Sequence, residues 1–137
     1  MVFEGIHCRL AIERPAPGVL VLRLSGSDVG EFGDAPMKAL DQELGKGPAQ
    51  LFIDARAVKG ASIDVSNDWA LWLRANRAAL TGISMLTGAP FVQLTAKFVQ
   101  RFAELGELMR IYTDPKAFDS ALKKEIGACP RGKVSGV

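Results

Sequence analysis

The stretch AQLFIDARAVKGASIDVSNDWALW, residues 49–72, decides the fold class of this chain. It begins with AQLFID, which is apolar on both faces, as in a central strand of a parallel sheet. It ends in a segment that places Trp69 and Trp72 on one face of an expected helix. Between the two lie serine and aspartate residues, which commonly begin helices. The stretch is therefore expected to form a strand followed by a helix, the repeating unit of a parallel sheet.

The same alternation of strand and helix runs through the rest of the chain. Apolar and polar residues alternate over His7–Glu13, and Gly18–Ser25 is almost continuously apolar. A Pro/Gly turn lies between the two segments, which predicts an antiparallel pair of strands. Further strands are expected over Ala49–Asp54, Gly82–Leu86 and Leu108–Tyr112, and helices from Asp34, Ser66, Pro90 and Asp114-Pro115 onward. The order predicts an α/β fold with a mixed, mostly parallel sheet of about five strands and about four helices.

Length and charge bound the class of protein. The 137 residues are expected to form a single domain over residues 1–126, followed by a flexible tail over 127–137. The net charge is +2, and the tail contributes Arg131 and Lys133. Subtracting these two from the 17 basic residues leaves 15, which equals the 15 acidic residues of the domain. Nucleic-acid-binding domains usually show a basic stripe, and none is visible, so we expect no nucleic-acid partner.

The chain shows no targeting or membrane segment. No apolar run approaches the roughly 18 to 20 residues of a membrane span, so no integral membrane segment is expected. The first residues, MVFEGIHCRL, lack the basic and apolar regions of a signal peptide. We therefore expect a cytoplasmic protein, in which Cys8 and Cys129 are free thiols.

No catalytic residue, metal site or cofactor is predicted. His7 and Cys8 are neighbours in an expected strand, so their side chains point to opposite faces and cannot form a thiol–base pair. A single histidine and the lack of a C-x-x-C pair leave no usual metal-ligand pattern. We therefore expect that the chain is not an enzyme.

The junction before the tryptophan helix is a candidate site. Four of its residues are candidates for partner contact or phosphorylation: Ser62, Asp64, Ser66 and Asp68. Free N–H groups and the dipole of a helix start favour an anion there by about 0.3–1 kcal/mol. The alternative is structural, with Ser66 as the N-cap and Asp68 in the first turn. We favour the alternative, because Asp64 and Asp68 already supply the negative charge that a phosphate would add.

The segment Pro90–Leu105 is a second candidate site. Its expected core stripe consists of Phe91, Leu94, Phe98, Phe102 and Leu105. Val92 and Val99 lie off that stripe, so the apolar surface is wider than one buried face needs. The excess is a candidate surface for a second subunit, an apolar ligand or a membrane, with Lys97 and Arg101 at its edge; dense packing against the sheet and a neighbouring helix is the other interpretation. The candidate residues of an apolar-ligand or dimer surface are Trp69, Trp72, Phe91, Val92, Phe98, Val99 and Phe102.

Two segments and the element order resemble the STAS family of anti-anti-sigma domains and the related SpoIIAA-like group, over Cys8–Ile126. AQLFIDARAV is similar to the family's central strand ending in Asp, and LMRIYTDPKAFDSAL to its last strand, Asp-Pro turn and closing helix. In STAS proteins a kinase phosphorylates the serine of an Asp-Ser pair that follows the strand's Asp. At that distance from Asp54 this chain has Ser62-Ile63 and no Asp-Ser pair. The resemblance is therefore closer to the SpoIIAA-like group, which has been associated with apolar or lipid-like ligands.

Three functions follow in order of preference. The first is a non-enzymatic regulatory or protein-interaction module that contacts a protein partner, or a second copy as a homodimer, through Lys59–Trp72 and the helix there. The second is a carrier or sensor of an apolar small molecule or lipid, which predicts an internal cavity near Phe91, Phe98 and the tryptophans. The third is a hydrolase or transferase, which predicts a convergent polar cluster with a perturbed pKa.

Overall fold

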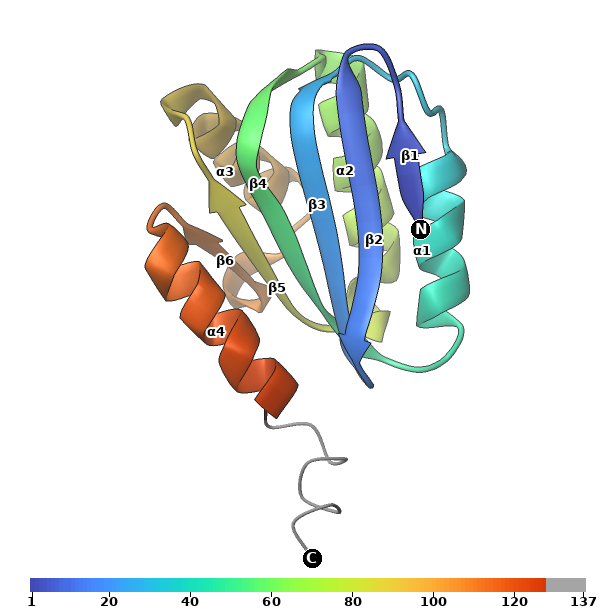
Figure 1. Ribbon diagram of the computed structural model, residues 1–137, viewed down its shortest axis with the longest axis vertical. Coiled ribbons are helices and arrows are strands. Elements are labelled where there is room, and N and C mark those ends of the chain that lie inside the picture. Colours follow the sequence, from blue (N-terminus) through green and yellow to red (C-terminus); the bar gives the residue numbers. More distant parts are fainter. Residues whose placement is uncertain (128–137) are drawn as a thin grey trace, which may run out of the picture.

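The computed structural model describes residues 1–127, which form one six-stranded sheet with helices on both faces (Figure 1). The strands are β1 Val2–Glu4, β2 Cys8–Ala16, β3 Val19–Asp28, β4 Ala49–Ala61, β5 Leu80–Thr87 and β6 Met109–Tyr112. They lie in the sheet in chain order; β1, β2 and β3 are antiparallel, and β3 to β6 are parallel. The mixed, mostly parallel α/β sheet is therefore confirmed, with β1 as a sixth strand. The predicted tail, with Cys129, Arg131 and Lys133, lies outside the described residues apart from Gly127.

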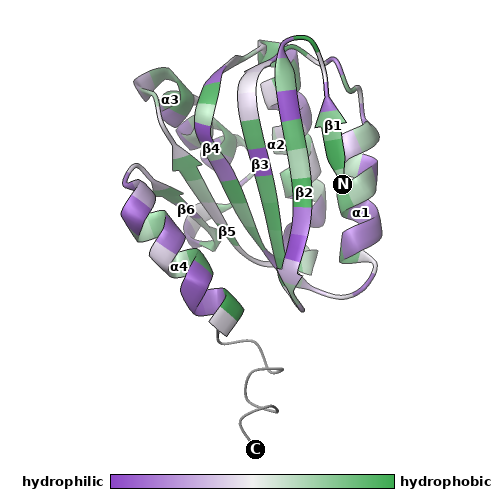
Figure 2. Ribbon diagram, viewed as in Figure 1, coloured by the Kyte–Doolittle hydropathy of each residue, from purple (hydrophilic) through white to green (hydrophobic). Residues whose placement is uncertain are grey.

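The helices form two unequal layers. They are α1 Ala35–Leu44, α2 Ile63–Asn76, α3 Pro90–Phe102 and α4 Pro115–Gly127, with short 3-10 turns η1 Arg77–Ala79 and η2 Gly106–Leu108. Figure 1 shows α1, α2 and α3 behind the sheet and α4 alone in front of it, beside β5 and β6. No helix of residues 1–127 covers the front face of β2 and β3, and Figure 2 shows polar residues alternating with apolar ones along β2 there. No helix among residues 1–127 is long and apolar enough to cross a bilayer.

Each layer has its own core. Behind the sheet, Leu10, Leu22, Leu51 and Ile83 are almost fully buried against α1, α2 and α3. In front of it, Phe52 of β4 meets Phe118 of α4 edge to face, with ring centroids 5.8 Å apart. Successive residues of β4 point to opposite faces, so Leu51 and Ile53 serve the rear core and Phe52 the front one. The apolar pattern on both faces of β4 is thus explained by its central position.

The strand β4 continues seven residues beyond the predicted end at Asp54. Its second half, Ala55–Ala61, pairs with the end of β3, with Ala57 beside Ser25 and Ala61 beside Asp28. Two shifts of register interrupt this pairing, and they accommodate a segment whose pattern does not alternate cleanly. As a result, β4 delivers the chain directly to the start of α2.

The start of α2 differs from the prediction. Ser62, with extended backbone angles, is the N-cap, and the helix begins at Ile63 rather than near Ser66. The helix also ends earlier than predicted, since Leu80 already belongs to β5. The starts of α1 after Asp34 and of α4 at Pro115 are confirmed, and Asp114 Oδ1 accepts a hydrogen bond from the Lys116 N–H at 3.1 Å.

The orientation of α3 is the largest correction. Val92, Ala96 and Val99 are 5, 1 and 7% exposed and face the sheet. The predicted core residues Phe91, Leu94, Phe98 and Phe102 are 60, 66, 49 and 40% exposed; of that stripe, Leu105, just after the helix, is buried. Small side chains at steps of four and three residues let the helix approach the sheet closely, and this turns the large side chains outward. The burial of Val92 and Val99 also removes them from any dimer surface.

Candidate functional site: a groove and cavity between α2 and α3

The N-terminus of α2 is held by Ser62. Its Oγ accepts a hydrogen bond from the Val65 N–H at 3.2 Å. Its carbonyl oxygen accepts two more, from the N–H and from the Oγ–H of Ser66, each at 3.0 Å. The hydroxyl of Ser66 is therefore bonded inside the helix, and Ser62 performs the capping role that we expected of Ser66. Asp64 lies in the first turn, where a negative charge is favourable.

An apolar groove of about 310 Å³ separates the N-terminal halves of α2 and α3. It is lined by Ala61, Ile63, Ser66 and Asn67 on one side and by Phe91, Leu94, Thr95 and Phe98 on the other. Ile63 is 80% exposed, as expected for a large apolar residue at the mouth of a groove rather than in a core. Beyond the groove, Phe102 stacks on Phe98, with centroids 5.7 Å apart.

Beneath the groove is a cavity of about 90 Å³ between the two helices and the sheet. Its walls are almost wholly apolar and include Leu22, Leu24, Ile53 and Met85 of the sheet and Trp69, Leu73, Val92 and Val99 of the helices. Four residues line both the cavity and the groove, namely Ala61, Ser66, Phe91 and Thr95. These four residues therefore form the boundary between the interior and the surface, and the exposed ring of Phe91 is the largest of them.

Charge is unevenly distributed around the groove. Asp64 and Asp68 of α2 are not among its lining residues, and Asp68 instead borders a small pocket against α1 with Phe32 and Met37. On α3, Lys97 and Arg101 are exposed and form no ion pair with any residue of the described part of the chain. The acidic and basic sides of the site thus belong to different helices.

The sequence-predicted residues fall into four groups in the structure. Ser66, Phe91 and Phe98 meet at the groove, and Trp69, Val92 and Val99 meet at the cavity. Ser62, Asp64 and Asp68 lie outside the groove, and Phe102 lies beyond its end. Trp72 is a core residue whose Nε1–H donates to Asp41 Oδ1 at 2.9 Å. Sequence reasoning missed Ile63, and an isoleucine between two polar residues at a helix start was the available indication.

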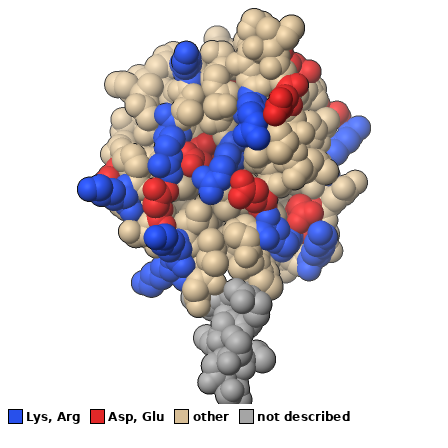
Figure 3. All heavy atoms as spheres, in the orientation of Figure 1, with Lys and Arg blue, Asp and Glu red and all other residues tan. Residues whose placement is uncertain are grey.

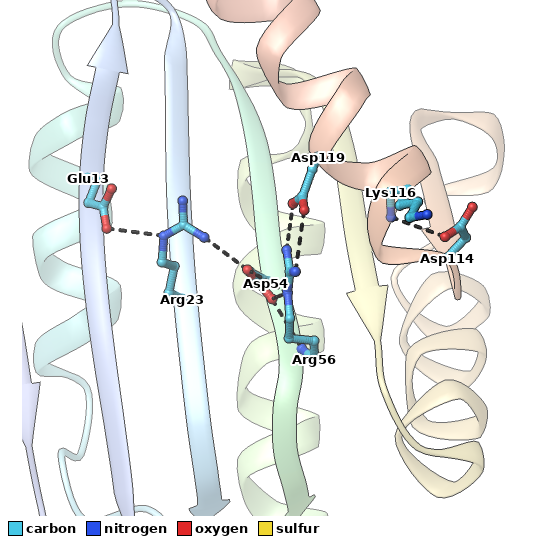
Figure 4. Close-up of polar contacts among 7 residues, drawn as sticks. All are labelled: Glu13, Arg23, Asp54, Arg56, Asp114, Lys116 and Asp119. Carbon is cyan, nitrogen blue, oxygen red and sulfur yellow. Dashed lines mark hydrogen bonds and ion pairs between the residues drawn. The ribbon is translucent and has the colours of Figure 1, made fainter.

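A chain of charged residues crosses the front face of the sheet (Figure 4). Arg23 bridges Glu13 and Asp54, at 3.2 and 2.9 Å, and Arg56 bridges Asp54 and Asp119 of α4, at 3.0 and 2.6 Å. Hydrogen bonds that Arg56 donates to Asp119 and then to Asp54 raise the pKa of Arg56 further above its ordinary value. Asp54 is 7% exposed, so water hardly solvates its charge. The guanidinium groups of Arg23 and Arg56 compensate that charge instead. The pairs join β2, β3 and β4 to α4.

The described residues gather no charge of one sign on this front face. Figure 3 shows Lys and Arg interspersed with Asp and Glu over it. Within residues 1–127 no three His, Cys, Asp or Glu side chains are placed to hold a metal ion. Cys8, which lines the apolar cavity, is 5% exposed; burial, with Asp28 and Glu31 nearby, raises the pKa of its thiol to about 11. The expectation that Cys8 is a free thiol is confirmed, and the residue belongs to the core.

Comparison with known proteins identifies the fold. No family model and no curated protein matches the chain. Among solved structures, an uncharacterised protein of Shewanella loihica PV-4 with a SpoIIAA-like fold is similar to this chain, with a TM-score of 0.62 and 15% sequence identity. The superposed part covers 88% of this chain and 98% of the Shewanella chain. This chain has a SpoIIAA-like fold. The resemblance stated from the sequence is confirmed at the level of the fold.

Two further structures share the SpoIIAA-like fold. An anti-sigma factor antagonist of Mycobacterium paratuberculosis matches 85% of this chain and 94% of its own, with a TM-score of 0.54 and 20% identity. The phosphorylated form of the Bacillus cell fate determinant SpoIIAA matches 82% of this chain and 98% of its own, with a TM-score of 0.54 and 19% identity. In the present SpoIIAA-like chain, the residue that follows β4 and caps α2 is Ser62.

Proposed function

We propose that this chain is a cytoplasmic, non-enzymatic regulatory module that binds a protein partner through the outer side of α2. We call this side the α2 surface and define it by Ile63, Asp64, Asp68 and Leu71. The observation that supports it most is the exposure of Ile63 and Leu71, 80 and 53%, beside two exposed carboxylates. One of the solved structures with this fold, the Mycobacterium paratuberculosis protein, is an anti-sigma factor antagonist, and an anti-sigma factor is accordingly the first partner class to test.

The chemistry of the α2 surface fits a partner with an apolar depression and a basic rim. Ile63 and Leu71 are eight residues apart, about two turns, and so share one side of the helix. Asp64 and Asp68 are four residues apart and lie along one edge of that side, the edge toward α1. Apolar side chains at the centre of an interface supply most of the affinity, and charges at its rim steer association and select partners. A phosphate on Ser62 would add to this negative rim at the helix start.

The test first identifies the partner and then measures its affinity. A photo-crosslinking amino acid at position 71, with position 123 on α4 as the control site, captures the protein that contacts α2. The purified partner is then titrated with wild type and with Leu71→Ala and Asp64→Asn/Asp68→Asn variants. We expect at least a tenfold loss of affinity, about 1.4 kcal/mol, for each. The Glu4→Gln/Glu107→Gln variant removes the same charge elsewhere and should bind as wild type; equal binding by all variants would refute the proposal.

A second function, carrier or sensor of an apolar small molecule, is favoured by the cavity beneath the groove. Ala96 is 1% exposed and lines it, so an Ala96→Leu variant should fill part of its 90 Å³. Native mass spectrometry after expression is expected to detect a retained apolar ligand in wild type and not in this variant. Ala75→Leu on the exposed side of α2 is the matched control. A wild-type protein that carries no ligand and binds no apolar dye would exclude this function.

A further inference from the structure

We propose that the outer face of α3 binds an anionic lipid surface. We call it the α3 face and define it by Phe91, Leu94, Lys97, Phe98, Arg101 and Phe102. It combines the four exposed large apolar side chains of the helix with its two cations, and it lies on a different helix from the α2 surface. The inference therefore goes beyond the partner binding proposed above and does not depend on it.

The apolar part of the α3 face is unusually exposed for a helix that is already packed. Phe91, Leu94, Phe98 and Phe102 are 40–66% exposed, although the helix covers the sheet with Val92, Ala96 and Val99. The large side chains repeat at steps of three and four residues, so they share one side along all 13 residues of the helix. Phe98 and Phe102 lie nearly parallel, with an angle of 22° between their rings. The face is thus a continuous strip rather than scattered single residues, and such a strip indicates an interaction surface.

The charges of α3 select an anionic surface. The helix contains Lys97 and Arg101 and no acidic residue. The two are four residues apart, on the same side as each other and next to Leu94 and Phe98. Glu104, which follows the helix, is already paired with Arg74 at 3.0 Å and lies 3.9 Å from Arg77, so it does not neutralise them. Cations that are unpaired within the described residues and lie beside exposed aromatic rings complement an acidic headgroup layer.

A lipid surface explains this mixture better than a protein partner does. Aromatic residues and arginine are also common in protein interfaces, so the residue that distinguishes the two occupants is Lys97, because lysine is depleted there. At a bilayer the rings enter the boundary of the acyl region while Lys and Arg side chains extend to the hydrated headgroups. Asp64 and Asp68 of α2 do not line the groove beside α3, so they oppose such docking little. Ile63 of the α2 surface lines the same groove as Phe91, Leu94 and Phe98, so a bilayer on the α3 face would cover part of the α2 surface and compete there with a protein partner.

The test is co-sedimentation of the purified protein with vesicles. One set is phosphatidylcholine alone, and the other is equal parts phosphatidylcholine and phosphatidylglycerol. We expect binding to the second set that falls as salt is added, and at least about tenfold weaker partitioning into the first. Absence of binding to the anionic vesicles would overturn the proposal.

Paired variants distinguish vesicle binding by the α3 face from general electrostatic attraction between the protein and anionic vesicles. Leu94→Gln/Phe98→Gln should abolish binding, and Leu71→Gln, an exposed leucine on α2, should not. Lys97→Gln/Arg101→Gln should lower the partition coefficient at least about tenfold. Lys123→Gln/Lys124→Gln changes net charge equally on α4 and should have little effect. Thermal unfolding of each variant checks the fold, since all these residues are exposed.

Two results would contradict the assignment directly. If the α4 variant loses as much binding as the α3 variant, the attraction is non-specific charge and the α3 face is not a lipid site. If sedimentation equilibrium shows a wild-type dimer that Leu94→Gln/Phe98→Gln dissociates, the occupant of the face is a second copy of the chain. Both results are read from the same purified proteins.

Discussion

Ser62 is the residue on which the start of α2 depends. Its Oγ is the acceptor for the Val65 N–H, which would otherwise lack a partner at the first turn. We expect Ser62→Ala to lower the free energy of unfolding by about 0.5–2 kcal/mol. Ser66→Ala should cost less, because its hydroxyl only adds a second bond to a carbonyl that the Ser66 N–H already uses. Urea denaturation measures both, and a larger loss for Ser66→Ala would contradict this account.

Glu31 makes a pH-dependent contribution through the loop before β2. Its carboxylate accepts hydrogen bonds from the N–H groups of Ile6 and His7, each at 2.8 Å. Partial desolvation raises its pKa, but these hydrogen bonds, first from His7 and then from Ile6, outweigh it and hold the pKa below its ordinary value of 4.5. The stabilisation is therefore full above pH 4.5 and is lost as the pH falls through the lowered pKa.

The corresponding prediction compares wild type with Glu31→Gln across pH. Since Gln does not titrate, the difference in unfolding free energy between the two proteins should be constant above pH 4.5 and shrink below it. Chemical denaturation at a series of pH values gives this difference. A difference that grows in acid would show that the carboxylate is not the stabilising form.

The residue-scale errors of the sequence analysis have a common cause. Ser62 and Ser66 both precede apolar residues at helical spacing, and nothing local distinguishes an N-cap from a serine one turn later. What separates them is the length of β4, which is set by pairing with β3 far away in the sequence. The capping chemistry was predictable, whereas the position at which it acts was not.

At the scale of elements, α3 has two apolar sides, and the structure decides which one is buried. Val99 is 7% exposed and Phe98 is 49% exposed. Val99→Ala should cost about 1–3 kcal/mol, because it removes two buried methyl groups and leaves a cavity in the core. Leu94→Gln/Phe98→Gln should change stability much less, since both side chains already face water. Thermal and urea unfolding distinguish the two, and a severe loss for the second variant alone would mean that the large side chains form the core.

Arg56 anchors α4 to the sheet. It contacts the buried carboxylate of Asp54 and the exposed one of Asp119. Arg56→Met is expected to cost about 1–3 kcal/mol, because Asp54 then keeps Arg23 alone as a charged partner among the described residues. Asp119→Asn removes only the exposed pair and should cost at most about 1 kcal/mol. Equal losses in denaturation experiments would assign the effect to the exposed pair instead.

The order of helices and strands was predictable because most of them are long enough to show their own apolar periodicity. Helices with a Pro start, such as α3 and α4, and the central apolar strand were placed near their observed positions. The strand β1 was missed because three residues, Val2–Glu4, are too few to show alternation. The second half of β4 was missed because Arg56, Lys59 and Gly60 are typical of loops, and pairing with β3 overrides that tendency. The side on which α3 packs needed the sheet to be present.

At the scale of the whole molecule, the two faces of the sheet have different roles in this account. In front, ion pairs and the Phe52–Phe118 contact fix α4. Behind, α2 and α3 expose large apolar side chains and enclose a groove and a cavity. The sequence predicted that these two helices carry the candidate site, whereas the proposal of a partner-binding side on α2 and a lipid-binding side on α3 depends on the orientation of α3 in the structure.

The most direct test of partner binding is hydrogen–deuterium exchange with and without the purified partner. The account predicts slower exchange on binding in peptides that cover residues 62–76, the start and body of α2, and unchanged exchange in α4. The α2 surface provides the exposed apolar and acidic groups, whereas α4 contributes mainly to the front core. Protection confined to α4 or to the uncovered face of β2 and β3, with α2 unchanged, would contradict the account.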